Sequence, residues 1–308
     1  MPLLPITNTT FYLPGANNLG VIATGDGGAI AIDTGLDREA GRLLRKALDE
    51  AKLKLRAVIN THHHADHIGG NAYLQRNIPD LLLCAPPIEA ALIENPILEP
   101  IYLGYGASPH NALRTRWLMA QGSNVQRQIG TLDRMACGHS ELIEVAGVRL
   151  ELLPLFGHSI AQVGVVYDGV AFVADGFFGR SVLAKHGIPY AHNIADQLAT
   201  IDRLAQRNER FFLPGHGELV AHAELEAELA ANRAAILRAS DLVLGALAEP
   251  GDLTMITARV LAALNHQLAG IPQYVIFTGA IAAHLSLLEQ QGRAAVTLTA
   301  QGLLWQQR

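Results

Sequence analysis

Hydrophobic and polar positions in the first third of the chain alternate between strand-like and helix-like periods. Asp26-Gly27-Gly28 separates two β-rich runs and predicts a hairpin. Leucines at helical spacing predict a helix over residues 38–51, and a second helix is expected to begin near Asp66. Short apolar runs bounded by turn residues predict strands at 19–24, 29–33, 55–60 and 80–84. Alternating strands and helices are typical of an α/β fold.

The alternation breaks down between residues 86 and 138. This stretch contains five prolines together with Tyr102, Tyr105 and Trp117. A long segment without clear elements is typical of a lid, a binding loop or a dimer contact. An ordinary helical insertion whose aromatic side chains fill the core would have the same composition, and the pattern does not decide between the two.

A β pattern returns after this segment and then gives way to helices. A regular β pattern covers residues 141–155, and strands are expected at 163–167, 170–174 and 210–213, with Asp168-Gly169 as a hairpin turn. From about residue 222 the chain becomes rich in Ala, Leu and Glu and predicts helices at 223–247, 253–268 and 274–291. A last hairpin is expected around Gln301-Gly302. The sequence therefore predicts a catalytic domain over residues 1–220 and a helical, winged-helix-like appendage over residues 221–308.

Composition narrows the class of protein. Half of the residues are hydrophobic and 17% are charged, which is enough for a large core. The net charge of −5 argues against a nucleic-acid partner and favours a small-molecule substrate. Cys84 and Cys137 lack CxxC spacing, and the N-terminus lacks the basic region of a signal peptide. We expect a cytoplasmic protein without membrane association, and a homodimer is compatible with the appendage.

The most informative segment is the run of residues 61–67, which contains His62, His64, Asp66 and His67 at H-x-H-x-D-H spacing. In an extended chain, side chains at i and i+2 point the same way, so the first two histidines can chelate one cation. As the chain turns into a helix, the Asp and the last His can face a second cation. A polar, exposed cluster at a strand end is the simpler explanation for one histidine, but not for four ligand-type residues within six positions.

Further ligand-type residues follow distant predicted strands. His158 lies in Gly157-His158-Ser159 after a β run, Asp175 directly follows the strand at 170–174, and His216 lies in Pro214-Gly215-His216-Gly217. Strand ends are where layered α/β folds gather functional groups. Singly, Asp175 could be a turn residue and His216 an ordinary loop residue. The other histidines have no partner pattern and are expected in the core or on the surface: His63, His110, His139, His186, His192, His222, His266 and His284.

Taken together, these motifs resemble the metallo-β-lactamase superfamily, whose pattern is H-x-H-x-D-H, then Gly-His-Ser/Thr, a bridging Asp and a late His. The resemblance covers about the first 220 residues and implies a four-layer αββα sandwich. It also implies that Asp33, in Ala31-Ile32-Asp33-Thr34-Gly35, supports a ligand without binding metal itself. By this resemblance the first metal would be held by His62, His64 and His158, the second by Asp66, His67 and His216, and both by Asp175.

The resemblance implies a binuclear hydrolase with a glyoxalase II-like or lactonase-like ligand set. Two divalent cations, zinc foremost with iron or manganese as alternatives, would activate a bridging hydroxide, and Asp66 would orient it or relay its proton. Asp175 argues against a true β-lactamase, because that branch typically lacks this carboxylate. Phe178 stands where acyl-homoserine lactonases have a Tyr, and residues 174–180 match the glyoxalase II motif only loosely.

Three functions follow from this pattern. The first is hydrolysis of a small-molecule thioester, lactone or carboxylic ester, favoured by the apolar insertion and by Phe177 and Phe178 near the expected metals. The second is phosphodiester cleavage, including RNA, which the acidic chain disfavours. The third is a catalytically silent, metal-bound sensor, which the complete ligand set disfavours.

Overall fold

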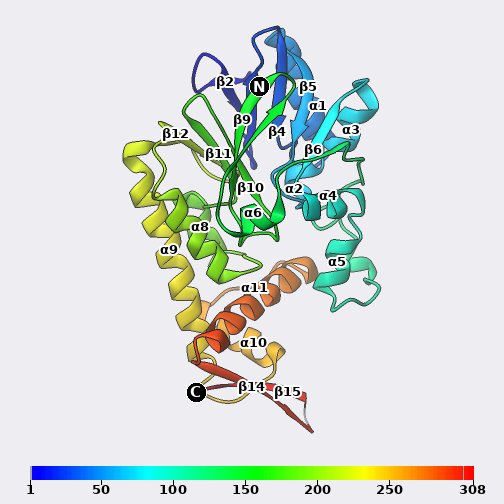
Figure 1. The fold of residues 1–308 in the computed structure, drawn as a ribbon. Coiled ribbons are helices and arrows are strands. Elements are labelled where there is room, and N and C mark those ends of the chain that lie inside the picture. The colour runs from blue at the N-terminus through cyan, green and yellow to red at the C-terminus, as the bar shows by residue number, and fades with distance from the viewer. Residues whose placement is uncertain (1, 301) are drawn as a thin grey trace.

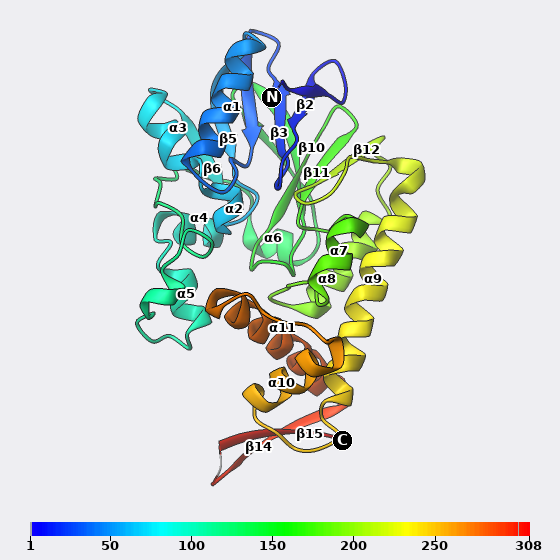
Figure 2. The same ribbon diagram turned by 180° about the vertical axis from the view of Figure 1, so that it is seen from behind.

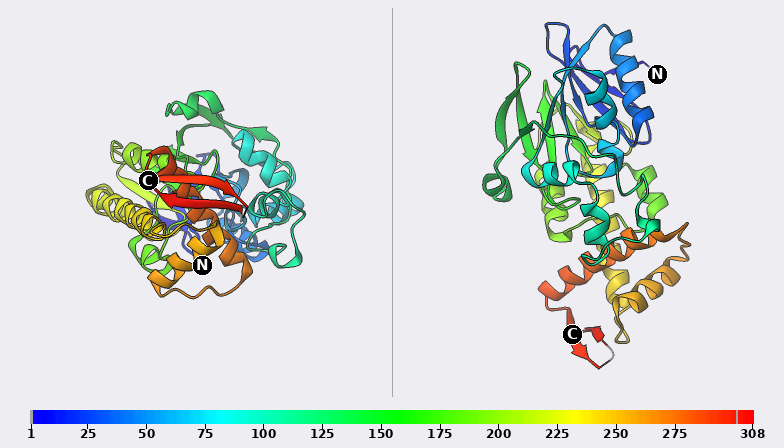
Figure 3. Two further views of the ribbon diagram at one scale, coloured as in Figure 1. Left: turned by 90° about the horizontal axis from the view of Figure 1, so that it is seen from below. Right: turned by 90° about the vertical axis from the view of Figure 1, so that its right-hand side faces the viewer.

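The computed structural model of the chain describes residues 2–300 and 302–308 (Figure 1). Two β-sheets pack face to face, and helices cover the outer face of each (Figures 1 and 2). This arrangement confirms the predicted αββα sandwich. A helical region that ends in a hairpin lies at the far end from the N-terminus (Figure 3). The proposed domain boundary at residue 220 stays a prediction.

The first sheet contains the N-terminal strands in sequence order. Its early strands pair antiparallel, and β4 to β7 are parallel. Parallel neighbours need crossover connections, which helices here provide. The strands are β1 (Leu4–Pro5), β2 (Thr10–Leu13), β3 (Leu19–Ala23), β4 (Gly28–Ile32), β5 (Lys54–Ile59), β6 (Leu82–Ala85) and β7 (Arg127–Gln128).

The second sheet has the order β13-β12-β11-β10-β9-β8. Its pairs are antiparallel except for β11 and β12, which are parallel. The β pattern at 141–155 is a hairpin that turns at Ala146-Gly147, where both residues have positive φ. The strands are β8 (Glu141–Val145), β9 (Val148–Pro154), β10 (Val163–Tyr167), β11 (Val170–Ala174), β12 (Phe211–Pro214) and β13 (Val220–Ala221).

Apolar side chains at alternating strand positions fill the space between the two sheets and between each sheet and its helices. Leu44 and Leu74, from the helices over the first sheet, pack with Val58 of β5. Ile59 and Phe172 pack in the layer between the sheets, and further apolar residues pack beneath the helices of the second sheet. The helices are α1 (Arg38–Glu50), α2 (Ala65–Ile68) and α3 (Asn71–Asn77) on the first side, and α7 (Arg180–His186) and α8 (Ile194–Leu204) on the second.

The helix expected from Asp66 onward is broken into α2 and α3 at Gly69-Gly70. A Cβ at Gly69 would lie 1.8 Å from the carbonyl oxygen of Leu36. Only glycine allows this close approach, which holds the end of the loop of residues 61–67 against the start of α1.

The segment at 86–138 has more structure than its sequence pattern indicates. It contains α4 (Pro87–Glu94), α5 (Leu98–Leu103), a 3-10 turn (Asn111–Leu113), β7 and α6 (Leu132–Ala136). Ile93 and Leu118 are buried, whereas Tyr105 and Trp117 are exposed. The segment is therefore an ordered insertion that also contributes surface aromatics.

The C-terminal region has a hydrophobic core of its own, in which Val243, Ile256 and Ile281 pack together. The hairpin predicted around Gln301-Gly302 is confirmed by the strand pairing of its described part. Gln301 itself lies outside the described residues. The elements are α9 (His222–Gly245), α10 (Leu253–Leu264), α11 (Ile271–Gln290), β14 (Ala294–Thr299) and β15 (Gly302–Gln307).

Candidate metal centre

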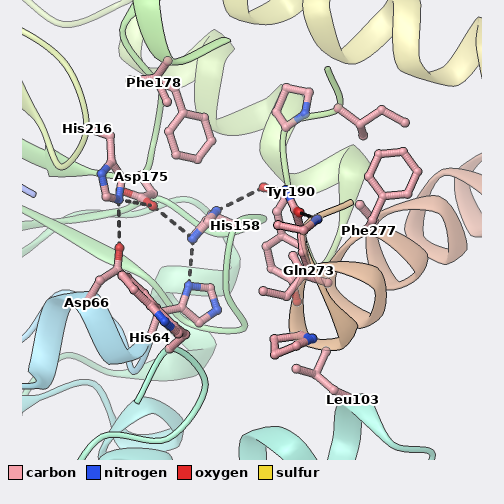
Figure 4. A pocket seen from close by; sticks show the side chains of 18 of the residues that line it. His64, Asp66, Leu103, His158, Asp175, Phe178, Tyr190, His216, Gln273 and Phe277 are labelled. Atoms are coloured by element: carbon pink, nitrogen blue, oxygen red, sulfur yellow. Dashed lines mark hydrogen bonds and ion pairs between the residues drawn. The ribbon is translucent and has the colours of Figure 1, made fainter. Parts of the chain in front are cut away.

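The ends of strands from both sheets meet at one edge of the sandwich. Asp33 directly follows β4, and the loop of residues 61–67 follows β5. His158, Asp175 and His216 come after β9, β11 and β12. The structure thus brings all seven sequence-predicted ligand residues to one place, and Figure 4 shows five of them side by side.

Three ring nitrogens converge at one end of this cluster. The Nδ1 atom of His64 lies 3.1 Å from Nε2 of His62 and 2.9 Å from Nε2 of His158. Burial, and then the neighbouring imidazoles, hold the pKa of His62 and of His64 well below the ordinary value. The pKa of His158 is also lowered, again chiefly by burial. These imidazoles are therefore neutral, which is the form that binds a metal.

The remaining residues form a second group around Asp175. Its Oδ2 atom lies 3.2 Å from Nε2 of His158 and 3.6 Å from Nε2 of His216, and its Oδ1 atom lies 3.4 Å from Nε2 of His67. Oδ2 of Asp66 is 3.1 Å from Nε2 of His216. The carboxylate of Asp175 therefore stands between the two groups of histidines.

Two buried atoms of this group test whether a cation fits. Nε2 of His67 and Oδ1 of Asp175 face each other at 3.4 Å as a loose ion pair, and neither makes a well-formed hydrogen bond to a described residue. A buried polar atom without a partner is destabilising unless something binds it. A divalent cation with nitrogen and oxygen ligands satisfies both atoms at once, so this donor set fits a metal centre.

Charge in the second group is balanced between carboxylates and imidazoles. Burial alone would raise the pKa of Asp175, but His216, His67 and His158 hold it well below its usual range. Burial lowers the pKa of His67, yet the neighbouring carboxylates raise it well above the ordinary value. In the same way Asp175 and Asp66 raise the pKa of His216 to about 9. Protons therefore compete with a cation here, and metal affinity should fall as the pH is lowered.

Hydrogen bonds to backbone carbonyls orient two of the histidines. Nδ1 of His158 donates to the carbonyl oxygen of Tyr190 at 3.1 Å, and Nδ1 of His216 donates to that of Ala16 at 2.7 Å. With the proton on Nδ1, the lone pair of Nε2 faces the centre.

Asp33 has the supporting position that the resemblance implies. It accepts hydrogen bonds from the backbone N–H of Thr61, from the Thr61 hydroxyl and from Nδ1 of His67, each at 2.8 Å. Its φ of 61° is in the left-handed region, which few residues other than Gly, Asn and Asp adopt. This conformation turns the carboxylate back toward the loop and holds His67 so that Nε2 faces Asp175.

Glu89, on α4, is a further residue of the centre that the sequence analysis missed. Its side chain is fully buried. It accepts hydrogen bonds from the backbone N–H and Nδ1 of His63, from the Ser159 hydroxyl at 2.8 Å and from the N–H of Ala161 at 2.7 Å. One carboxylate therefore joins the loop that carries His62 and His64 to the loop that carries His158.

His63 is buried rather than exposed, and it has partners that its sequence neighbourhood does not indicate. Besides Glu89, its Nε2 atom lies 3.0 Å from the hydroxyl oxygen of Tyr102. These partners are 26 and 39 positions away, so no local spacing could reveal them. Of the other histidines, His284 is buried against Ser240, while the side chain of His186 lies outside the described part of the chain.

A cavity of about 680 Å³ opens onto the cluster. His64, Asp66 and Asp175 lie at its metal end, and Phe178 lines it, with its ring centroid 5.6 Å from that of His158. The expectation that Phe177 also lies there was wrong, because this side chain is completely buried under α8 and α9. Glu99 lies on the wall, where burial raises the pKa of its carboxyl group to about 8 and keeps it uncharged at neutral pH.

Comparisons with known proteins agree with this geometry. Residues 12–115 match the family model of the metallo-beta-lactamase superfamily. A hydroxyacylglutathione hydrolase from Xanthomonas euvesicatoria pv. vesicatoria is 26% identical over 224 residues, which are 72% of this chain and 69% of the relative. One from Photobacterium profundum is 28% identical over 133 residues, which are 43% of this chain and 37% of the relative.

Solved structures share the fold over the whole chain. A beta-lactamase domain protein from Burkholderia ambifaria has a TM-score of 0.73 at 17% identity, covering 100% of this chain and 95% of its own. A metallo-beta-lactamase family protein from Thermus thermophilus has a TM-score of 0.74 at 19% identity, covering 99% of this chain and 100% of its own. The chain therefore contains a metallo-β-lactamase superfamily domain, matched over residues 12–115, and is a metal-dependent hydrolase.

Proposed function

We propose that this enzyme hydrolyses a small-molecule thioester, lactone or other carboxylic ester at a centre of two divalent cations. The observation that carries the proposal is the cavity of about 680 Å³, which joins the His and Asp cluster at one end to a largely apolar lining. Pockets of this size and character bind small organic molecules. The name of the Xanthomonas relative, a hydrolase of glutathione thioesters, supports carboxyl rather than phosphoryl chemistry.

The proposal assigns the first cation to the three converging histidines and the second to the group around Asp66, with Asp175 shared by both. Zinc is the first candidate, and iron or manganese accept the same nitrogen and oxygen ligands. When bound, such cations polarise the substrate carbonyl and lower the pKa of a coordinated water, so that water attacks near neutral pH. The ligands are His62, His64 and His158 for the first cation, and Asp66, His67 and His216 for the second.

Asp66 has the position of a proton-handling residue. About a third of its side chain is exposed, and it lies on the cavity wall, with its Oδ2 atom directed at His216. From this position the carboxylate can orient the attacking water and take up its proton. Attack on the carbonyl carbon then breaks the bond to sulfur or oxygen, and the departing thiolate or alkoxide takes a proton to leave as thiol or alcohol.

The charge of the cavity disfavours the phosphodiester alternative. No Lys or Arg is found among the described residues that line the cavity, and Asp66 and Asp175 add carboxylates. Beyond the two proposed cations, a polyanion such as RNA would therefore meet no basic side chain in the cavity. Glutathione itself bears two carboxylates, so the substrate of the Xanthomonas relative is not assigned to this chain.

A side-by-side screen tests the proposal. Acyl thioesters, lactones, p-nitrophenyl esters and bis-p-nitrophenyl phosphate are incubated with protein loaded separately with zinc, manganese or iron. We expect turnover of carboxyl substrates and its loss in Asp66→Asn, with the fold unchanged by circular dichroism. Preferential turnover of the phosphodiester would instead support the nuclease alternative. A metal-loaded protein that turns over none of them would support the sensor alternative.

A further inference from the structure

One face of α11 forms a wall of the cavity. Gln273, Ile276, Phe277 and Ala280 line it, and their spacing of i, i+3, i+4 and i+7 places them on one side of a helix. Figure 4 shows Gln273 and Phe277 on the side of the cavity away from His216 and Asp66. The C-terminal region, for which the sequence indicates only a structural or dimerising role, is thus part of the substrate cavity.

A neighbouring side of α11 belongs to the hydrophobic core of the C-terminal region, and Phe277 and Ala280 contribute to both the core and the cavity wall. Ile281, Leu285 and Leu288 are completely buried there. With a core on one side and an apolar cavity beside it, α11 keeps only a narrow exposed face, to which Ser286 and Glu289 belong. This accounts for the composition of α11, which in the described part of the chain is the helix with the length and apolar character of a membrane span.

The facing walls are also apolar. Leu103 and Trp117 come from the insertion, and Val182 and Leu183 come from α7. These elements are far apart in sequence, and α5 and the 3-10 turn of the insertion both contact α11. The space beyond the cluster is therefore an apolar chamber formed by the insertion, α7 and α11.

We propose that this chamber binds an uncharged alkyl or aryl group of the substrate, and that α11 determines how long that group can be. The inference rests on the proposed ester or thioester hydrolysis. The chain occupying the chamber is attached to the scissile group on its acyl side or on its leaving-group side, and the two sources share the same chemistry. Each methylene group buried here should raise kcat/KM about fourfold until the chamber is full.

Ile276 is the best position at which to test whether α11 limits the length of the bound group. It is partly exposed to the cavity and is not among the buried residues of the C-terminal core, so its replacement should leave the fold intact. Ile276→Trp narrows the chamber and Ile276→Ala widens it. Ser286→Trp is the matched control, because Ser286 is exposed on the same helix and does not line the cavity.

The activity arm uses two series of p-nitrophenyl or alkyl esters, one lengthened on the acyl side and one on the alcohol side. In one series kcat/KM should rise with chain length in the wild type. Ile276→Trp should lower kcat/KM at least tenfold more for the longest members than for acetyl esters, and Ile276→Ala should shift the optimum to longer chains. The series that responds identifies which side of the ester enters the chamber. A profile that is the same in Ile276→Trp as in Ser286→Trp would overturn the inference.

A binding arm separates this inference from the proposed reaction. The neutral fluorescent probe N-phenyl-1-naphthylamine is titrated into the purified full-length chain, and neutral alkyl amides of increasing length compete for it. We expect binding to wild type and Ser286→Trp, with at least tenfold weaker binding to Ile276→Trp. If no ester is hydrolysed but the probe binds in this pattern, the proposed reaction is refuted and binding of an apolar group in the chamber is supported. If esters are hydrolysed and the probe binds Ile276→Trp as tightly as wild type, binding in the chamber is refuted and the proposed reaction is supported.

Discussion

Replacing Glu89 with Gln should loosen the metal centre without touching a proposed ligand. The carboxylate uses Oε2 for the N–H and Nδ1 of His63, and Oε1 for Ser159 and Ala161. Gln keeps one acceptor oxygen, so two of these donors face an amide NH₂ in either orientation. Hydrogen bonds to a charged group contribute about 1.5–3 kcal/mol each, so the loss of two should lower the free energy of unfolding by about 3–6 kcal/mol.

The effect should also appear in metal affinity. Residues that orient metal ligands typically change affinity about 10- to 100-fold when they are replaced. Because Glu89 joins the two loops that carry His62, His64 and His158, the loss of affinity should be larger for the first cation than for the second.

Competition with a chromophoric zinc chelator measures both affinities, and denaturant unfolding measures stability. Glu144→Gln on β8 is the control, since that residue is exposed and far from these loops along the chain. Glu89→Gln protein that binds two zinc ions as tightly as wild type, and unfolds at the same denaturant concentration, would refute the positioning role.

Three other outcomes follow from the structure. Gly215→Ala should lower activity and metal content, because a Cβ there would lie 2.4 Å from Oδ1 of Asp175 and 2.9 Å from Cε1 of His67. Plasma emission spectroscopy measures the metal content. A metal content equal to that of the wild type would show that the added Cβ does not displace these side chains. Burial lowers the pKa of His284 from 6.5 to about 4. Below about pH 6.5 the unfolded chain therefore takes up a proton at this residue that the folded chain does not. As a result, the free energy of unfolding should fall by about 3 kcal/mol between neutral pH and pH 4. Denaturant unfolding of His284→Gln should show that much less pH dependence, and an unchanged slope would exclude this histidine as the cause. Removing metal with EDTA should lower the melting temperature measured by calorimetry, and zinc should restore it, because a ligand bound only by the folded state stabilises that state.

The core of the centre could be predicted from sequence because its information is local. The H-x-H-x-D-H spacing follows from the geometry of an extended chain entering a helix, and His158, Asp175 and His216 each follow an apolar strand. Parallel and antiparallel strands of two packed sheets bring such ends to one edge, so seven positions were enough to predict the cluster.

Other features depend on tertiary packing and have no local signal. Glu89 reads as an ordinary helix residue, and its role exists only because α4 packs beside two loops. Phe177 and Phe178 look alike in sequence, but the backbone beyond Ala174, whose φ is 45°, buries the first and directs the second to the cavity. The Ala146-Gly147 turn lacks the Asn or Asp that usually marks a hairpin, so the β pattern at 141–155 does not show where β8 ends and β9 begins.

The C-terminal wall of the cavity was missed for a related reason. A surface helix is recognised by an apolar stripe opposite a polar one. Because α11 is apolar on two sides, its sequence indicates burial but not that one of the two sides lines a cavity.

The most direct test of the metal centre is anomalous diffraction at the zinc absorption edge from crystals of the zinc-loaded protein. We expect one peak among Nε2 of His62, Nδ1 of His64 and Nε2 of His158. We expect a second peak beside Asp66, His67 and His216, with Asp175 between the two. Crystals grown with excess zinc that show no peak at this edge of the sandwich, or peaks bound only by other residues, would contradict the two-cation assignment.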